Sequence, residues 1–178
     1  FRQETELFLD SVLREDRSVL ELIRTDYTFL NERLARHYGI PGIYGSRFRR
    51  VNLPNPEQRG GLLGNGALLA TTSYPDRTSP VLRGKWLLDN ILAAPVPPPP
   101  PDVNTNLDDT KSDRPMTVRE TLERHRANPT CASCHARMDP LGFSLEHFDA
   151  IGQWRAMDGE SPINATGVLL DGTTVDGP

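Results

Sequence analysis

The sequence predicts a mainly α, loop-rich fold that includes a polyproline segment and a short β-hairpin. Several stretches place apolar residues at helical spacing, whereas alternating strand patterns are short and few. The chain of 178 residues contains 16 prolines and 14 glycines, and its 37% of hydrophobic residues is below the usual globular share. All three observations favour short helices joined by many turns over an extended sheet.

The first forty residues are predicted to form three helices. Residues 1–14 place apolar side chains on one helical face. After a short turn, Ser18 supplies a capping hydroxyl for a second segment. Residues 26–38 have apolar and aromatic positions at helical spacing, and Gly39 follows them, a residue type that often ends helices. We therefore expect a helical layer in this part of the chain.

Residues 40–94 are predicted to contain one short strand and one capped helix. Residues 47–53 alternate well enough for a short strand. Residues 59–70 are rich in glycine but lack the Lys-Ser/Thr of a phosphate-binding loop, so we expect close backbone packing there instead of nucleotide binding. Ser79 and Pro80 begin a helix, because a capping hydroxyl followed by proline is the favoured order at a helix start.

The segment from residue 95 to residue 115 is predicted to be a spacer. Residues 97–101 are five consecutive prolines, which favour an extended polyproline II conformation and cannot join a sheet. Residues 102–115 are polar, so we expect them to form an exposed loop. An internal spacer is a better interpretation of this segment than a ligand for an SH3-type domain.

Two helices and a hairpin are expected after the spacer. A capping box at Thr117 begins the first helix, which runs through Arg126. Asn128, followed by proline, breaks that helix and caps the second one. We expect the second helix to end at Asp139, because the next residue is again a proline. Residues 168–175 contain Asp-Gly between two apolar runs, which is a hairpin signal.

The only two cysteines lie within the sequence Cys131-Ala132-Ser133-Cys134-His135, which has the spacing used to attach c-type haem. Each thiol can add to one vinyl group of the haem, and the histidine that follows can bind the iron as its proximal ligand. On a helix these three side chains share one face, because they are three and four residues apart. The pattern predicts one covalently attached haem c on Cys131, Cys134 and His135.

Other interpretations of the two cysteines remain open. A thioredoxin-like redox pair would need a βαβ setting, which the sequence does not show. A structural zinc site would need a second ligand pair at short spacing, and the remaining histidines, His37, His125 and His147, form no such pair. A structural disulfide between the two cysteines is a further alternative.

The sixth ligand of the iron decides between an electron carrier and an enzyme. His125 is the preferred candidate, because it ends the helix before the motif and the chain can fold back at the break between the two helices. Met138 follows the motif on the same helix, so we expect it on the proximal side, packed against the edge of the haem. Met116, His147 and Met157 are further candidates, and an iron without a sixth protein ligand is also open.

Composition excludes some classes of function and suggests a compartment. The net charge of -4 argues against the positively charged surface that nucleic-acid binding requires. No apolar run is long enough to span a membrane. The sequence begins at Phe1 and stops in what reads as a turn, so we expect a piece of a longer or processed protein. The haem motif indicates a periplasmic or otherwise exported location, because bacteria attach c-type haem outside the cytoplasm.

Several motifs occur in an order that resembles a known family. They are Arg59–Leu63, Arg77–Trp86, the proline run, Cys131–Phe143 and Phe148–Arg155. From about Asp26 onward, this order resembles the cytochrome-like domain of unknown function number fifteen eighty-eight, found in large secreted proteins of planctomycetes and related bacteria. The resemblance implies haem on Cys131, Cys134 and His135 within a multidomain exported protein, and His125 fits its pattern of a histidine before the motif. It implies no established reaction.

These observations predict four segments and one function. The segments are the helical end of a preceding domain (1–25), a helical scaffold (26–94), a polyproline and polar linker (95–115) and a cytochrome c-like haem-binding segment (116–178). The expected function is one-electron transfer to other redox proteins or to subunits of a larger complex, which makes the chain a carrier more than a catalyst. The alternatives are a haem enzyme module with an open iron, peroxidase-like or dehydrogenase-linked, and a structural subunit stapled by haem.

Overall fold

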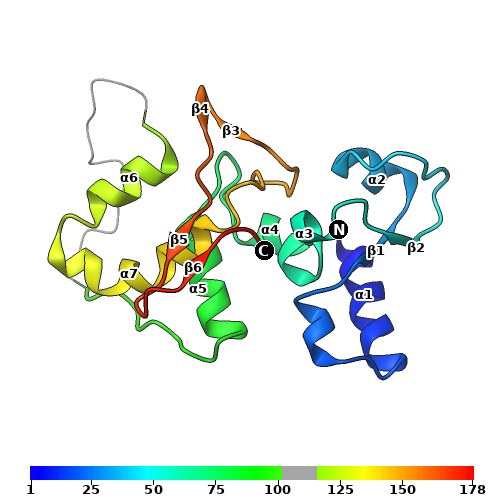
Figure 1. The fold of residues 1–178 in the computed structure, drawn as a ribbon, viewed down its shortest axis with the longest axis horizontal. Helices are drawn as coiled ribbons and strands as arrows, with labels where there is room; N and C mark the ends of the chain where they lie inside the picture. Colours follow the sequence, from blue (N-terminus) through cyan, green and yellow to red (C-terminus); the bar gives the residue numbers. More distant parts are fainter. Residues whose placement is uncertain (102–115) are drawn as a thin grey trace. The chain divides into compact units, whose positions relative to one another are not determined.

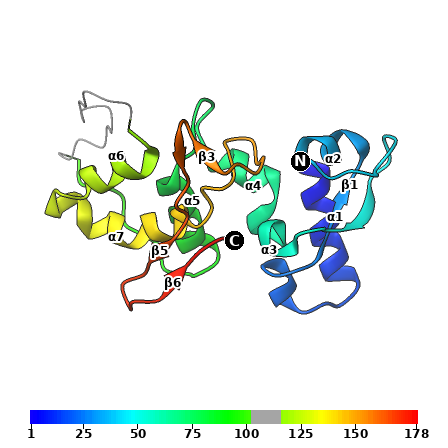
Figure 2. The same ribbon diagram turned by 45° about the horizontal axis from the view of Figure 1, so that its top comes forward.

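The computed structural model describes residues 1–101 and 116–178, which form two compact units (Figures 1 and 2). Unit 1 contains Phe1–Arg77, Phe148–Arg155 and Gly177–Pro178, and unit 2 contains Thr78–His147 and Ala156–Asp176. The exposed loop expected at 102–115 lies outside the described residues. The four segments that the sequence predicts stay a prediction.

Unit 1 combines short helices with one two-stranded sheet. Its elements are α1 (Arg2–Arg14), η1 (Val19–Leu22), β1 (Tyr27–Leu30), α2 (Glu32–Tyr38), β2 (Arg49–Asn52), α3 (Pro56–Arg59), η2 (Leu62–Gly64) and α4 (Gly66–Thr71). The predicted first helix is α1, and the predicted strand is β2. The Ser18 hydroxyl caps η1 as expected, since it accepts a hydrogen bond from the Leu20 amide.

The helix predicted over residues 26–38 is wrong in its first half. Tyr27–Leu30 forms β1, which pairs antiparallel with β2 and places Tyr27 opposite Asn52. This run consists of aromatic, β-branched and leucine side chains, which suit a half-buried pleated surface. Asn31 then caps α2 by accepting a hydrogen bond from the Leu34 amide, and Gly39, with φ of 71°, ends α2 as predicted.

A buried carboxyl group holds the helices of unit 1 together. Glu4 on α1 is only 1% exposed. It accepts hydrogen bonds from the Thr28 hydroxyl (2.9 Å) and from the Tyr38 hydroxyl (2.6 Å), and Tyr38 in turn accepts one from the Gly66 amide (2.9 Å). Burial raises the pKa of Glu4. The first helix is therefore bonded into the body of unit 1.

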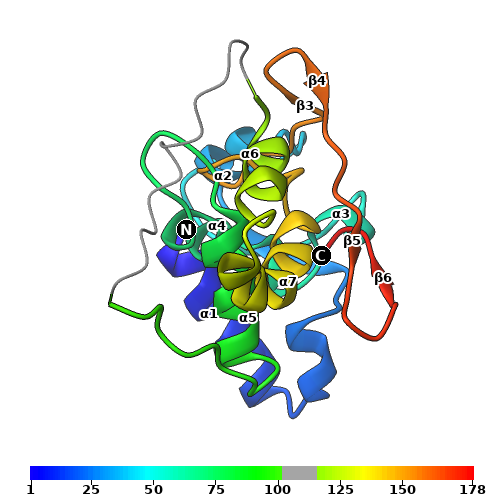
Figure 3. The same cartoon turned by 90° about the vertical axis from the view of Figure 1, so that its left-hand side faces the viewer.

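Unit 2 is built around two long helices, with short hairpins after them (Figure 3). Its elements are α5 (Pro80–Asn90), α6 (Val118–His125), α7 (Pro129–Phe143), β3 (Met157–Asp158), β4 (Ser161–Pro162), β5 (Gly167–Val168) and β6 (Thr174–Val175). The predicted hairpin is confirmed as β5–β6, whereas β3–β4 was not predicted. The described residues are thus rich in helix, with two-residue and four-residue strands, which confirms the mainly α, loop-rich prediction.

The backbones of α5 and α7 touch at two glycines. A Cβ atom added to Gly84 on α5 would overlap the carbonyl group of Met138 on α7. A Cβ atom added to Gly142 on α7 would likewise overlap the carbonyl group of Pro80 on α5. Glycine lacks this atom, so it permits a contact that a larger residue would prevent. The two helices are therefore locked in one relative position.

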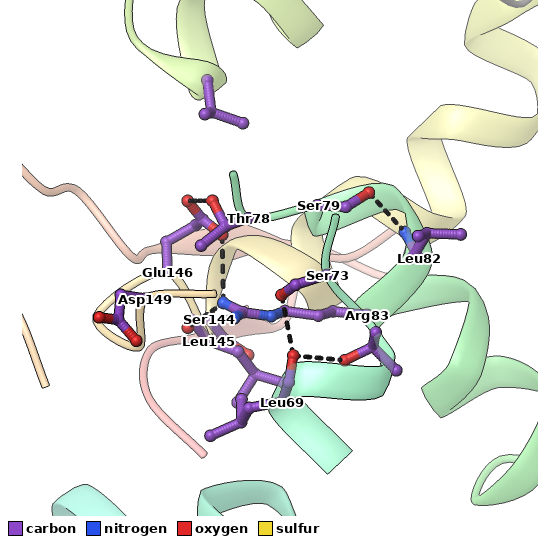
Figure 4. Close-up of polar contacts among 12 residues, drawn as sticks. Leu69, Ser73, Thr78, Ser79, Leu82, Arg83, Ser144, Leu145, Glu146 and Asp149 are labelled. Carbon is purple, nitrogen blue, oxygen red and sulfur yellow. Dashed lines mark hydrogen bonds and ion pairs between the residues drawn. The ribbon is translucent and has the colours of Figure 1, made fainter. Parts of the chain in front are cut away.

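A buried arginine joins the start of α5 to the chain that follows α7 (Figure 4). Arg83 is completely buried and donates a hydrogen bond to the carbonyl oxygen of Leu145 (2.8 Å). The same guanidinium lies 3.3 Å from a carboxylate oxygen of Glu146, and the Thr78 hydroxyl donates to the other oxygen at 2.9 Å. The buried charges are thus paired, as their desolvation requires.

The predicted end of α7 at Asp139 is wrong, because the helix continues through Pro140 to Phe143. Proline in a helix interior lacks the amide that would bond to the preceding turn, a loss of about 3 kcal/mol. Burial of Pro140, Gly142 and Phe143 offsets this loss. The chain at Gly167 also packs against the carbonyl group of Pro140. Tertiary contacts therefore overrule the local preference.

Candidate functional site

The first two turns of α7 carry both cysteines and His135. Asn128 caps this helix by accepting a hydrogen bond from the Thr130 amide (2.9 Å), and Pro129 occupies the first helical position, as predicted. This start places Cys131 in the first turn and Cys134 in the next. Both are free thiols and partly exposed, so the structure contains no disulfide between them and leaves them open to covalent chemistry.

An apolar cluster borders one side of this cysteine face. Cys134 packs against a buried group formed by Leu88 of α5, Val96 and Met138. Met138 is 6% exposed, so its thioether lies within this core. The prediction that Met138 packs against the edge of a haem stays a prediction. The contacts show that a group attached at Cys134 would meet apolar surface on this side.

His135 is held by a carboxylate one helical turn away. Its Nδ1 atom lies 2.9 Å from Oδ1 of Asp139, whose side chain is completely buried. An ionised carboxylate can only accept hydrogen bonds, so a hydrogen on Nδ1 would be donated to Asp139 and the lone pair would then be on Nε2. Metal-binding histidines are usually held in this way through the nitrogen that does not bind the metal.

Arg126 approaches the same carboxylate from the end of α6. Its Nε atom lies 3.4 Å from Oδ2 of Asp139, and this oxygen has no hydrogen-bond partner. The interaction is therefore an ion pair with poor hydrogen-bond geometry. Sequence analysis assigned Asp139 only as a helix end, although its i, i+4 spacing from His135 could have indicated a partner. Nothing in the local sequence pointed to Arg126.

The structure brings His125 of α6 against His135. The centroids of the two imidazole rings are 4.8 Å apart, and the rings meet edge to face at 69°. Burial lowers the pKa of His125, and the neighbouring His135 lowers it further. These effects favour neutral imidazole, the form that binds metals. His125 thus lies beside the predicted proximal histidine, and its role as distal ligand stays a prediction.

The other candidates for the sixth position have different surroundings. The sulfur of Met116 accepts a hydrogen bond from Arg124 (3.8 Å). Met157 lies on β3 and is 46% exposed. His147 follows the buried Glu146. Within residues 1–101 and 116–178, no group of three or more histidine, cysteine, aspartate or glutamate side chains is arranged to hold a metal ion.

The donor groups on this face match those that covalently attached haem requires. Two partly exposed thiols are one turn apart, and an imidazole whose Nδ1 atom faces Asp139 follows them. A second imidazole lies next to the first, and apolar side chains border Cys134. In the described part of the chain, no helix is long and apolar enough to cross a membrane.

Comparison with known proteins gives two family matches. The model described as PSCyt3, protein of unknown function (DUF1588), matches residues 59–158, and PSD4, protein of unknown function (DUF1592), matches residues 1–40. Both are planctomycete cytochrome-type families of unknown function. No curated protein and no solved structure gives a significant match. Glu4 and Tyr38 lie in the PSD4 segment and Gly66 lies in the PSCyt3 segment, so hydrogen bonds within unit 1 join the two matched segments.

Proposed function

The chain belongs to the DUF1588 family of proteins of unknown function, and on that premise we propose that it is a c-type cytochrome domain for one-electron transfer. The observation that carries the proposal is the position of His135 beside two free thiols. His135 follows Cys131 and Cys134 on the same helical face, and its Nδ1 atom lies 2.9 Å from Asp139. When bound, haem c would supply the one-electron couple of its iron.

The side chains of α7 would attach the haem and provide one ligand of its iron. Cys131 and Cys134 would hold the ring through two thioether bonds, and His135 Nε2 would bind the iron. The contacts of Gly84 and Gly142 fix α7 against α5, so these groups are presented by a rigid element. A rigid site suits electron transfer, because little has to move when the charge changes.

His125 would be the second protein ligand of the iron. Its lowered pKa favours the neutral form, and its ring, in edge-to-face contact with His135 at a centroid distance of 4.8 Å, would move away from His135 to admit the iron. An iron held by both histidines would have no position for peroxide, oxygen or substrate. This arrangement favours a carrier over a haem enzyme module.

The compartment and the partners follow from the same chemistry. Because bacteria attach c-type haem outside the cytoplasm, we place the domain in the periplasm or in another exported location. Its electrons would pass to or from other redox proteins or subunits of a larger complex. The net charge of -4 makes nucleic acid a poor partner.

Attachment is tested by producing the chain together with a c-type haem maturation system. We expect a haem band that stays with the protein after denaturation, and its loss when Cys131→Ala and Cys134→Ala are combined. Ser133→Ala is the matched control, because Ser133 lies between the cysteines and its exposed hydroxyl bonds to the carbonyl oxygen of Thr130 (2.7 Å) and only weakly to the sulfur of Cys134 (3.8 Å). A wild-type chain without covalent haem would refute the proposal.

Coordination is tested by optical spectra of the oxidised and reduced protein, followed by addition of carbon monoxide. A six-coordinate carrier should be low-spin and slow to bind carbon monoxide. His125→Ala should convert it to a high-spin form, whereas Glu123→Ala, on the same helix, should not. Fast binding by the wild type would instead favour the haem enzyme module. An unchanged spectrum in His125→Ala would remove His125 as the ligand.

A further inference from the structure

We propose that Asp139 is a positioning residue that fixes His135 in the tautomer with hydrogen on Nδ1 and strengthens Nε2 as a donor to iron. The part about iron rests on the proposed function above. The part about the tautomer concerns side chains of this chain alone. The two parts can therefore fail separately.

Among the described residues, only His135 is placed to form a strong hydrogen bond with the Asp139 carboxylate. The side chain is completely buried, and its Oδ1 atom faces His135 Nδ1 at 2.9 Å. Its Oδ2 atom has no hydrogen bond, and Arg126 lies 3.4 Å away in an imperfect ion pair. A buried carboxylate needs both charge and hydrogen-bond compensation. The hydrogen bond from His135 is thus the main compensation, and it is strengthened by the charge of the acceptor.

This hydrogen bond changes the electronic character of His135. A carboxylate that pulls on the Nδ1 hydrogen makes the ring more basic at Nε2. A more basic axial ligand stabilises ferric over ferrous iron, so it lowers the reduction potential. Asp139 would therefore tune the site without touching the iron. The continuation of α7 to Phe143 keeps Asp139 inside the helix, so the distance to His135 is set by ordered backbone.

The tautomer is tested first on the 178-residue chain produced without haem attachment. Two-bond nitrogen–proton correlation spectra distinguish histidine that is protonated on Nδ1 from histidine that is protonated on Nε2. We expect His135 to be Nδ1-protonated in the wild type. Asp139→Asn should reduce the ratio of the two tautomers about tenfold, because the free-energy advantage of a charged acceptor over a neutral one corresponds to about a tenfold change in an equilibrium constant. A wild-type His135 that is protonated on Nε2, or a mixture, would overturn the inference.

The effect on iron is then measured by redox titration of the haem-loaded chain. Asp139→Asn should shift the ferric-to-ferrous equilibrium about tenfold toward the ferrous form, which is a rise of about 59 mV for one electron. Glu123→Gln is the control, because it removes an exposed carboxylate of α6 that pairs with Arg119. An unchanged potential in a variant with full haem content would contradict the inference.

The outcomes separate this inference from the proposed function. Absence of covalent haem in the wild type refutes the proposed function, whereas the wild-type tautomer measurement still decides the role of Asp139. If Asp139→Asn does not fold, the wild-type spectrum alone decides, since the Nδ1-protonated form is required. If Asp139 had only a structural role, Asp139→Asn would change neither the tautomer of His135 nor the reduction potential in a folded variant.

Discussion

Gly84→Ala probes the contact that positions α7. The added Cβ atom would lie much closer than 3.0 Å to the carbonyl oxygen of Met138, whereas Cβ atoms in real structures essentially never come closer than 3.0 Å to such an atom. Because the obstacle is backbone, no rotation of a side chain can relieve it, and the two helices must separate. Overpacking of this kind costs about 3 kcal/mol at the upper end of its usual range. Alanine recovers about 1 kcal/mol through its better helix propensity, so the net loss is about 2 kcal/mol.

The loss should appear in thermal unfolding and in hydrogen exchange. A net 2 kcal/mol corresponds to a fall in Tm of roughly 4–8 °C for a chain of this size. The amides of α5 and α7 should lose protection, since both belong to unit 2. Lys85→Ala is the matched control, because it also places alanine on α5 but removes only an exposed pair with Asp89. Its effect should stay within about 0.5 kcal/mol.

Equal stability of Gly84→Ala and Lys85→Ala would refute the reasoning. It would mean that the backbones of α5 and α7 are not in contact at Gly84. Loss of protection confined to α1 and the sheet of unit 1 would also contradict it. A fall in Tm together with loss of protection in α7 is the outcome that the contact requires.

Three further predictions concern buried charge and capping. Burial raises the pKa of Glu4 above its ordinary value, so its contribution to stability is fully present below the unfolded-state pKa and is lost as the pH rises through the folded-state pKa. Glu4→Gln should therefore flatten the pH dependence of urea unfolding in that range, and an unchanged slope would contradict this origin. Arg83→Met should destabilise unit 2 by roughly 3–5 kcal/mol, because it removes the guanidinium that pairs with the buried Glu146, and Arg83→Met combined with Glu146→Leu should recover much of the loss. A double variant as unstable as the single one in urea unfolding would argue against the ion pair as the cause. Thr117→Ala removes the capping box and should cost about 1 kcal/mol, with faster hydrogen exchange in α6, whereas retained protection would show that the cap is dispensable.

Helix starts were predictable because their determinants are local. Ser79, Thr117 and Asn128 each cap the helix that follows them through a side-chain oxygen and a backbone amide two or three residues away. The glycines of residues 59–70 also behave as expected, since a Cβ at Gly61 would overlap the carbonyl group of Ile23. Such features depend on residue type and short spacing, so a sequence shows them directly.

The errors arose where distant residues decide the local conformation. Tyr27–Leu30 is a strand because it pairs with Arg49–Asn52, and its apolar residues alone fit a helix as well. For the candidate site, spacing indicated that Cys131 and His135 share a helical face. The contact between Arg126 and Asp139 depends on how α6 folds back on α7, which no local pattern encodes.

The wrongly predicted end of α7 bears directly on the proposed chemistry. Had the helix ended at Asp139, this carboxylate would sit at a fraying terminus with an unsettled distance to His135. The extra turn buries Gly142 and Phe143 instead, and the guanidinium of Arg119 on α6 stacks 3.8 Å from the centre of the Phe143 ring. Both α5 and α6 therefore pack against the part of α7 beyond Pro140. The turn that proline was expected to prevent is what holds Asp139 in place, and with it the orientation of His135.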